Sequence, residues 1–140
     1  MVEPSGSDLS STIEALGEAL PESLKWEWDD RFDGVLAAFE VIDKDHILEI
    51  LNSQFGQAWD GTSISNAPDS ISCAIQEFGR MTANQLLFTS DSDRDVILLG
   101  LWWPWGNGAT ISIRFITYAS ENSASDKESV RSALRGAFGL

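Results

Sequence analysis

Cysteine and histidine are almost missing from this chain, which contains one of each in 140 residues. A single cysteine, Cys73, cannot form a disulfide within the chain, and this fits a reducing compartment. Zinc sites need clusters of cysteine and histidine, which the sequence does not contain. A nucleophilic pair of Cys73 and His46 would need contact between the side chains and a third group to orient them. No pattern links the two positions, so we expect neither zinc nor cysteine catalysis.

Long apolar runs and common catalytic motifs are also absent. No run approaches the roughly 18 apolar residues of a membrane span, and the start MVEPSGSDLSS lacks the basic and apolar segments of a secretory signal. We therefore expect a soluble, cytoplasmic protein. The chain has no phosphate-binding glycine loop and no G-x-S-x-G motif, and Gly100, Gly106 and Gly108 form no dinucleotide fingerprint. The sequence therefore predicts no enzyme, no catalytic residue and no cofactor.

Three aspartates, Asp91, Asp93 and Asp95, have the spacing of the first half of a calcium-binding loop. Such a loop needs glycine at its sixth position and glutamate at its twelfth. Val96 and Trp102 occupy these positions. We therefore interpret the aspartates as a polar hairpin turn and expect no metal site.

Basic residues are scarce: the chain has 9 Lys and Arg against 22 Asp and Glu, a formal net charge of −13 at pH 7. Residues 1–70 hold 15 acids and 3 bases, whereas residues 71–140 hold 7 acids and 6 bases. Such a field repels nucleic acid and anionic membranes, so we expect neither as a partner. It attracts a basic protein and speeds the encounter. The alternative is that the charge serves only solubility or a salty habitat, although salt adaptation should acidify both halves.

Apolar periodicity predicts an α+β fold, with an antiparallel sheet of about five strands and three to four helices packed against it. We expect residues 1–7 to be disordered and residues 8–140 to form one domain. The segment 56–66 is polar and contains glycine, which predicts a loop. The predicted helices are 8–20, 44–55, 68–79 and 125–138, and the predicted strands are 24–29, 35–41, 85–90, 95–104 and 110–118.

The centre of the predicted sheet is a long hairpin over residues 95–118. Ile111, Ile113 and Phe115 alternate with Ser112 and Arg114, which indicates a strand with one buried face. Asn-Gly in the segment WGNG favours a tight reversal between the strands. The proline at position 104 removes a backbone donor, which is typical of an edge or a bulge. We therefore expect Trp105, at the tip, to be an exposed aromatic residue that anchors a partner or stacks on a sugar. Structural packing is the alternative.

A dense acidic turn follows the first predicted strand and contains Asp29, Asp30 and Asp33. Glu27 and Glu40 project from the adjoining strands, and we expect them on the same exposed face. One interpretation is a solvated turn, because aspartate is a common turn residue. The other is a charged rim that pairs with Arg or Lys of a partner. We take these five acids and Trp105 as the predicted partner-binding residues.

These observations favour a binding protein of the immunity type, an inhibitor that plugs the positively lined site of a basic toxin or nuclease. The alternative is a dimeric chaperone that binds a segment of a secreted effector. The chain resembles type III secretion chaperones in its size, its acidity and its helix-first start, and this resemblance implies a homodimer with an exposed apolar groove. It differs in its strands, because two strands followed by two helices are predicted after the first helix, where those chaperones have three strands.

Overall fold

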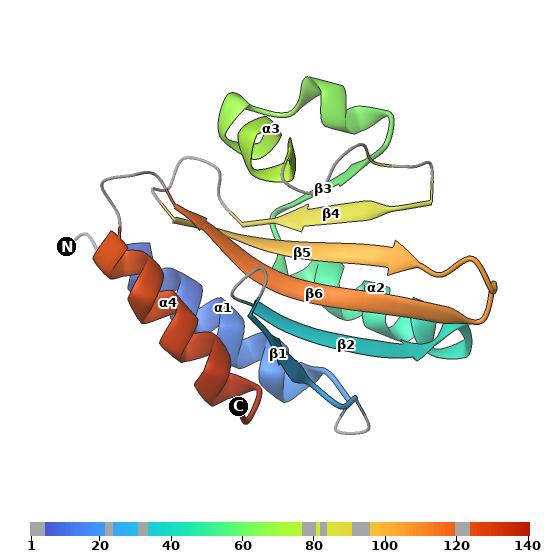
Figure 1. The fold of residues 1–140 in the computed structure, drawn as a ribbon, viewed down its shortest axis with the longest axis horizontal. Helices are drawn as coiled ribbons and strands as arrows, with labels where there is room; N and C mark the ends of the chain where they lie inside the picture. Colours follow the sequence, from blue (N-terminus) through green and yellow to red (C-terminus); the bar gives the residue numbers. More distant parts are fainter. Residues whose placement is uncertain are drawn as a thin grey trace.

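Within the described part of the chain, six antiparallel strands and four α-helices make an α+β fold (Figure 1). The computed structural model describes residues 5–21, 24–30, 34–76, 81, 84–90, 96–119 and 124–140. The α-helices are α1 (Ser5–Ala19), α2 (Lys44–Gln54), α3 (Asp69–Ile75) and α4 (Ala124–Ala137), and the short 3-10 helices are η1 (Val41–Asp43) and η2 (Ser63–Asn66). The strands are β1 (Glu27–Asp29), β2 (Gly34–Glu40), β3 (Gln57–Asp60), β4 (Leu86–Thr89), β5 (Val96–Pro104) and β6 (Thr110–Ala119).

The sheet has the order β1-β2-β6-β5-β4-β3, and every neighbouring pair is antiparallel. The predicted hairpin of β5 and β6 lies at its centre and has the longest pairing, from Val96 opposite Ala119 to Pro104 opposite Ile111. β2 joins the other side of β6, far along the chain, with Val35 opposite Phe115. This long-range pairing decides which residues of the acidic half share a face with the central hairpin.

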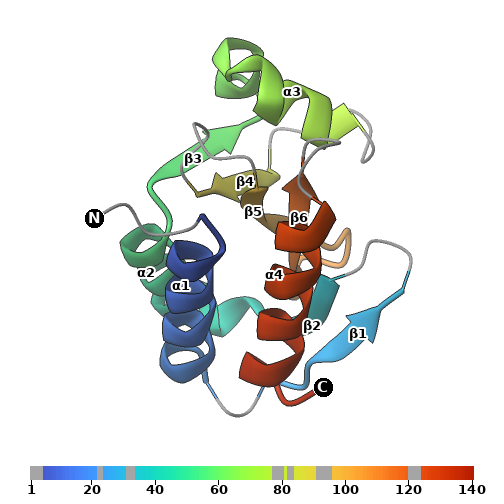
Figure 2. The same ribbon diagram turned by 90° about the vertical axis from the view of Figure 1, so that its left-hand side faces the viewer.

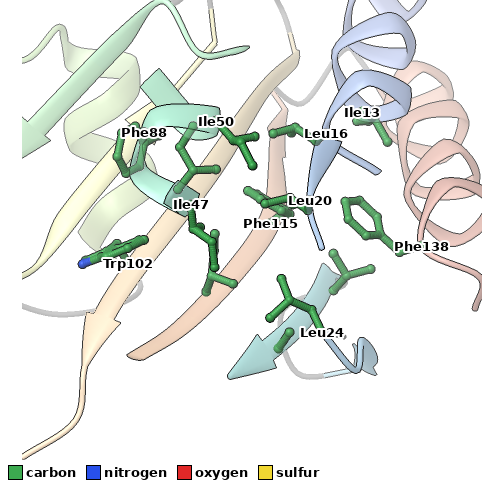
Figure 3. Close-up of a cluster of buried hydrophobic side chains, with 14 of the residues drawn as sticks. Ile13, Leu16, Leu20, Leu24, Ile47, Ile50, Phe88, Trp102, Phe115 and Phe138 are labelled. Carbon is green, nitrogen blue, oxygen red and sulfur yellow. The ribbon is translucent and has the colours of Figure 1, made fainter. Parts of the chain in front are cut away.

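Three helices cover one face of the sheet. α1 and α4 run side by side (Figure 2), and α2 packs beside them in the same apolar cluster. Figure 3 shows Leu16 of α1, Ile50 of α2 and Phe138, which directly follows α4, around Phe115 of β6. Phe115 stacks on Trp26, with ring centroids 5.5 Å apart, and on Phe55, at 6.0 Å. Gly100 of β5 leaves room for these rings, because an added Cβ would lie 3.3 Å from both Phe115 and Phe55.

The other face of the sheet is covered at one end by α3. Ile71 and Ile75 of this helix pack on residues of β4, β5 and β6 in a second apolar cluster. Leu98 belongs to the first cluster, whereas its neighbours Ile97 and Leu99 belong to the second. β5 is therefore buried on both faces, which explains its unbroken apolar run.

The strand β3 corrects the prediction of a loop at 56–66. Gln57 to Asp60 pairs with β4 and forms one edge of the sheet. Trp59 is the one large apolar side chain of β3, so the strand has no alternating pattern that periodicity could detect. The sheet thus has six strands instead of about five. The first predicted strand is also shorter, because only Glu27–Asp29 of 24–29 is paired.

Among the described residues, none of the helices has the length and apolarity that a membrane crossing requires. α1 begins at Ser5, and residues 1–4 of the segment predicted to be disordered lie outside the described residues. The predicted calcium-like turn at Asp91, Asp93 and Asp95 lies outside them as well.

Candidate functional site

The sheet register gathers three of the six predicted partner-binding residues, Glu27, Asp29 and Glu40, on one surface. Glu27, Leu36 and Arg114 lie opposite one another across β1, β2 and β6. Asp29 lies two residues along β1 from Glu27, and Glu40 lies four residues along β2 from Leu36, so all share a face. This face is opposite α1, α2 and α4, and we call its part over β1, β2 and β6 the open face.

The open face is hollowed. A groove of about 480 Å³ runs over it. Glu27 and Ala38 are exposed along this groove, and Leu36 and Ser112 are partly exposed. The second apolar cluster, which contains residues of α3, lies on the same face of the sheet but closer to the β3 edge. The groove is lined by Lys25, Glu27, Leu36, Ala37, Ala38, Trp105, Ser112 and Arg114.

An ion pair holds the edge strand against the centre of the sheet. Arg114 Nε lies 2.8 Å from Asp29 Oδ2, and the two side chains keep 23% and 13% of their exposure. The contact spans β2 next to Gly34, which lies opposite Asp29. Asp29 is therefore engaged within the chain, whereas Glu27, Asp30 and Glu40 are the exposed acids of this region. Asp33 lies outside the described residues.

Trp105 stands at the end of the open face, in the loop between β5 and β6. Its backbone N–H donates to the carbonyl of Thr110 at 2.8 Å, and Gly108 takes a positive φ of 70°. Asn107 Oδ1 accepts hydrogen bonds from the backbone N–H groups of Ala109 and Thr110, at 2.9 and 3.0 Å. The loop thus fixes the tip, where Trp105 is 50% exposed. Its position allows it to anchor a partner.

A second hollow lies on the helix side of the same tip, and we call it the tip hollow. Its volume is about 290 Å³, and Trp105 lines both hollows. Pro104 pairs with β6 only, because the pairing of β4 with β5 ends at Trp102. The proline thus sits where no strand needs its missing N–H. The tip hollow is lined by Val41, Lys44, Leu48, Asn84, Trp102, Pro104, Trp105, Gly108, Thr110 and Ile111.

Cys73 and His46 are not brought together. His46 lies on α2 and Cys73 on α3, and these helices pack on opposite faces of the sheet. Both residues are exposed. The residues that the structure describes contain no group of three or more His, Cys, Asp or Glu side chains that could hold a metal ion.

Among the described carboxylates, Asp60 has a clearly lowered pKa. The backbone N–H groups of Ser63 and Thr62 donate to Asp60 Oδ1 at 2.7 and 2.9 Å and hold its pKa below the ordinary value of 3.8. The backbone N–H of Asp60 donates in return to Ser63 Oγ at 2.9 Å. This reciprocal arrangement closes the turn between β3 and η2. We assign it a structural role at the end of β3.

Sequence reasoning missed the residues that form the floor of the open face, which are Leu36, Ala38, Ser112 and Arg114. The alternation in β6 already placed Ser112 and Arg114 on the face away from Ile113. The missing information was the partner of β6, because no local pattern identifies β2 as its neighbour. Comparison of the chain with protein-family models, with curated proteins and with solved structures finds no match.

Proposed function

We propose that this chain is an immunity-type inhibitor, an acidic cytoplasmic protein that binds a basic toxin, such as a nuclease, and plugs its site. The observation that carries the proposal is the shared position of Glu27, Glu40 and Trp105 around one hollowed part of the sheet. In this proposal the acids provide a charged rim and Trp105 an aromatic anchor at one end of the face, and both are features of protein interfaces. The net charge of −13 steers a basic partner toward the protein from a distance.

Two kinds of residue on the open face contribute to the proposed binding in different ways. Glu27 and Glu40 are exposed, so their charges are screened by salt and act mainly on the rate of association. Trp105 is expected to bury its ring in the partner, and truncation of such an anchor costs about 2 kcal/mol, or about thirtyfold in affinity. Asp29 contributes indirectly, because its pairing with Arg114 holds β1 in place.

Affinity capture from native lysate tests the proposal with two matched baits. The first bait carries Glu27→Lys and Glu40→Lys, on the open face. The second carries Glu14→Lys and Glu18→Lys, on exposed positions of α1 beyond the opposite face. Both baits have the same net charge, so a loss confined to the first assigns binding to the open face.

The proposal predicts one basic protein that the wild type and the α1 bait retain at low salt, and that rising salt releases. The purified partner should lose its activity at a 1:1 ratio with the chain. A partner that both baits lose equally would point to net charge alone, and a partner that stays fully active would contradict inhibition.

The second candidate is a dimeric chaperone for an effector segment, and exposed apolar side chains near the tip favour it. Ile42 is 81% exposed and Val41 is 36% exposed. Molar mass by light scattering separates the two candidates, because the chaperone predicts a homodimer and a strict monomer argues against it. An Ile42→Ser variant that remains soluble and loses dimerisation would support the chaperone.

A further inference from the structure

The tip hollow has a different character from the open face. It lies between the first turns of α2, the end of β5 and the loop between β5 and β6. Val41, Leu48 and Ile111 supply apolar surface, and Lys44, Asn84 and Thr110 supply polar groups. Its volume of about 290 Å³ is at the lower end of the range for ligand pockets, roughly 300–1,000 Å³. This size suits one ring better than a chain of rings.

Trp102 gives the tip hollow a hydrogen-bond donor without a protein acceptor. The residue is only 4% exposed, and its ring packs on Phe39 with centroids 5.3 Å apart. Figure 3 shows the indole nitrogen turned away from the surrounding core side chains. Within the described part of the chain, Nε1–H of Trp102 makes no hydrogen bond, and its nitrogen is not sealed from solvent. Because Trp102 lines the hollow, this donor can serve a ligand there.

Trp59 provides a comparison, because its indole donor is paired within the chain. Trp59 is partly buried on β3, and its Nε1–H donates to Thr89 Oγ1 at 3.1 Å. Buried indole N–H groups ordinarily find such a partner, because an unpaired donor costs free energy. Trp102 Nε1–H is instead open to solvent, so a ligand in the tip hollow can supply the acceptor that the described residues do not.

Charge around the tip hollow favours a neutral ligand. Among the described residues that line it, Lys44 is the one cation, and the exposed Asp43 and Asp45 flank it in sequence. The local balance is therefore negative, as is the whole chain, and an anionic ligand would be repelled. Asn84 and Thr110 each offer both donors and acceptors. A neutral molecule with several hydroxyl groups satisfies this mixture.

We propose that the tip hollow binds a single neutral pyranose ring. The C–H groups on one face of a pyranose are apolar and carry a small positive charge, so they pack against the negative face of an indole. Trp105 provides that surface, and Trp102 Nε1–H donates to a ring hydroxyl. This site goes beyond the proposed inhibition and does not depend on it, since Trp102 lies on the helix face of the sheet, away from the open face.

Nuclear magnetic resonance of the six indole N–H groups tests the proposal directly in the wild-type protein. The probes are methyl β-D-glucopyranoside, methyl β-D-galactopyranoside and methyl α-D-mannopyranoside, with cyclohexanecarboxylate as an anionic comparison. Titration should extend to roughly 100 mM, where even a millimolar Kd saturates. At least one pyranoside should shift the Trp102 and Trp105 signals with one common Kd, while the hydrogen-bonded Trp59 signal stays in place.

Variants then assign the site. Trp102→Phe keeps an aromatic ring in the core and removes the donor, and it should weaken binding about tenfold. Asn84→Ala changes an exposed residue and should weaken binding at least about threefold. Trp103→Phe is the matched control, because Trp103 lies on the other face of β5, and it should leave the affinity unchanged.

Several outcomes would overturn the proposal. One is the absence of a saturable shift with any pyranoside in the wild type, a measurement that requires no variant to fold. Another is saturable binding of cyclohexanecarboxylate alone, which would assign an anion site. A third is equal affinity in wild type, Trp102→Phe and Asn84→Ala. Finally, if only a protein partner shifts the Trp102 signal, the tip hollow belongs to a protein interface.

Discussion

Breaking the ion pair between Arg114 and Asp29 should release the edge strand β1 and lower the stability of the whole chain. The charged atoms are 2.8 Å apart. Their Coulomb attraction is about 6 kcal/mol at an effective dielectric constant of about 20. Desolvation offsets most of this attraction, since the side chains keep only 23% and 13% of their exposure. We expect a net coupling of about 1.5 kcal/mol, between the values for exposed and fully buried pairs.

A double-mutant cycle with Arg114→Gln and Asp29→Asn measures this coupling through urea unfolding followed by tryptophan fluorescence. Each single variant should lose about 2 kcal/mol, because the remaining partner is left without its counter-charge. This loss corresponds to a fall in Tm of about 6 °C for a chain of this size. The coupling should persist in about 1 M salt, where the Debye length is about 3 Å, because the pair is largely shielded from solvent.

The exposed pair of Arg131 and Glu128 on α4 is the matched control. Its atoms are 3.2 Å apart, and its side chains keep 31% and 65% of their exposure. The same cycle should give at most about 0.5 kcal/mol there, and salt should remove it. Equal coupling for the two pairs, or a coupling below about 0.5 kcal/mol for Arg114 and Asp29, would refute the argument that partial burial strengthens the contact across β2.

Three further predictions concern single positions. Gly34→Ala should cost about 3 kcal/mol in urea unfolding, because its Cβ would clash with the backbone carbonyl of Phe115, and near-wild-type stability would contradict the packing. Thr117→Val should be neutral or stabilising by up to about 1 kcal/mol, because the buried Thr117 Oγ1 has no hydrogen-bond partner in the described structure; a clear loss in Tm would oppose this. Asp60 should titrate below 3.8 when its carboxyl carbon is followed by nuclear magnetic resonance, because the Ser63 backbone N–H stabilises its charged form. Its contribution to stability is therefore present above pH 3.8 and disappears as the pH falls through the lowered pKa. Asp60→Asn should remove that pH dependence, and a titration at or above 3.8 would disprove the assignment.

Local patterns in the sequence predicted the elements whose burial is regular. The alternation around Ile113 and the apolar run of β5 identified the central hairpin, and the helical stripes identified all four α-helices. β3 was missed because its side chains are mostly exposed. It pairs with β4 through backbone groups, and such pairing leaves no apolar pattern in the sequence. The paired part of the first strand was overestimated, because Trp26 is partly buried by packing on Phe115 and Phe138 without strand pairing.

The candidate site could be predicted only in part. Alternation indicated that Glu27 and Glu40 project outward, and the turn chemistry indicated an exposed Trp105. Their common surface depends on the pairing of β2 with β6, which joins positions at least 70 residues apart and is decided by the packing of the whole core. For the same reason, no local pattern indicated that Arg114 engages Asp29.

Association kinetics with the purified basic partner test the central claim most directly. The rate constant should be measured by stopped-flow fluorescence across a salt series for wild type, Glu27→Lys/Glu40→Lys and Glu14→Lys/Glu18→Lys. The open-face variant should associate at least about tenfold more slowly at low salt, with a weaker salt dependence than the α1 variant of equal charge. Equal rates for the two variants would contradict the claim that the open face is the surface that meets the partner.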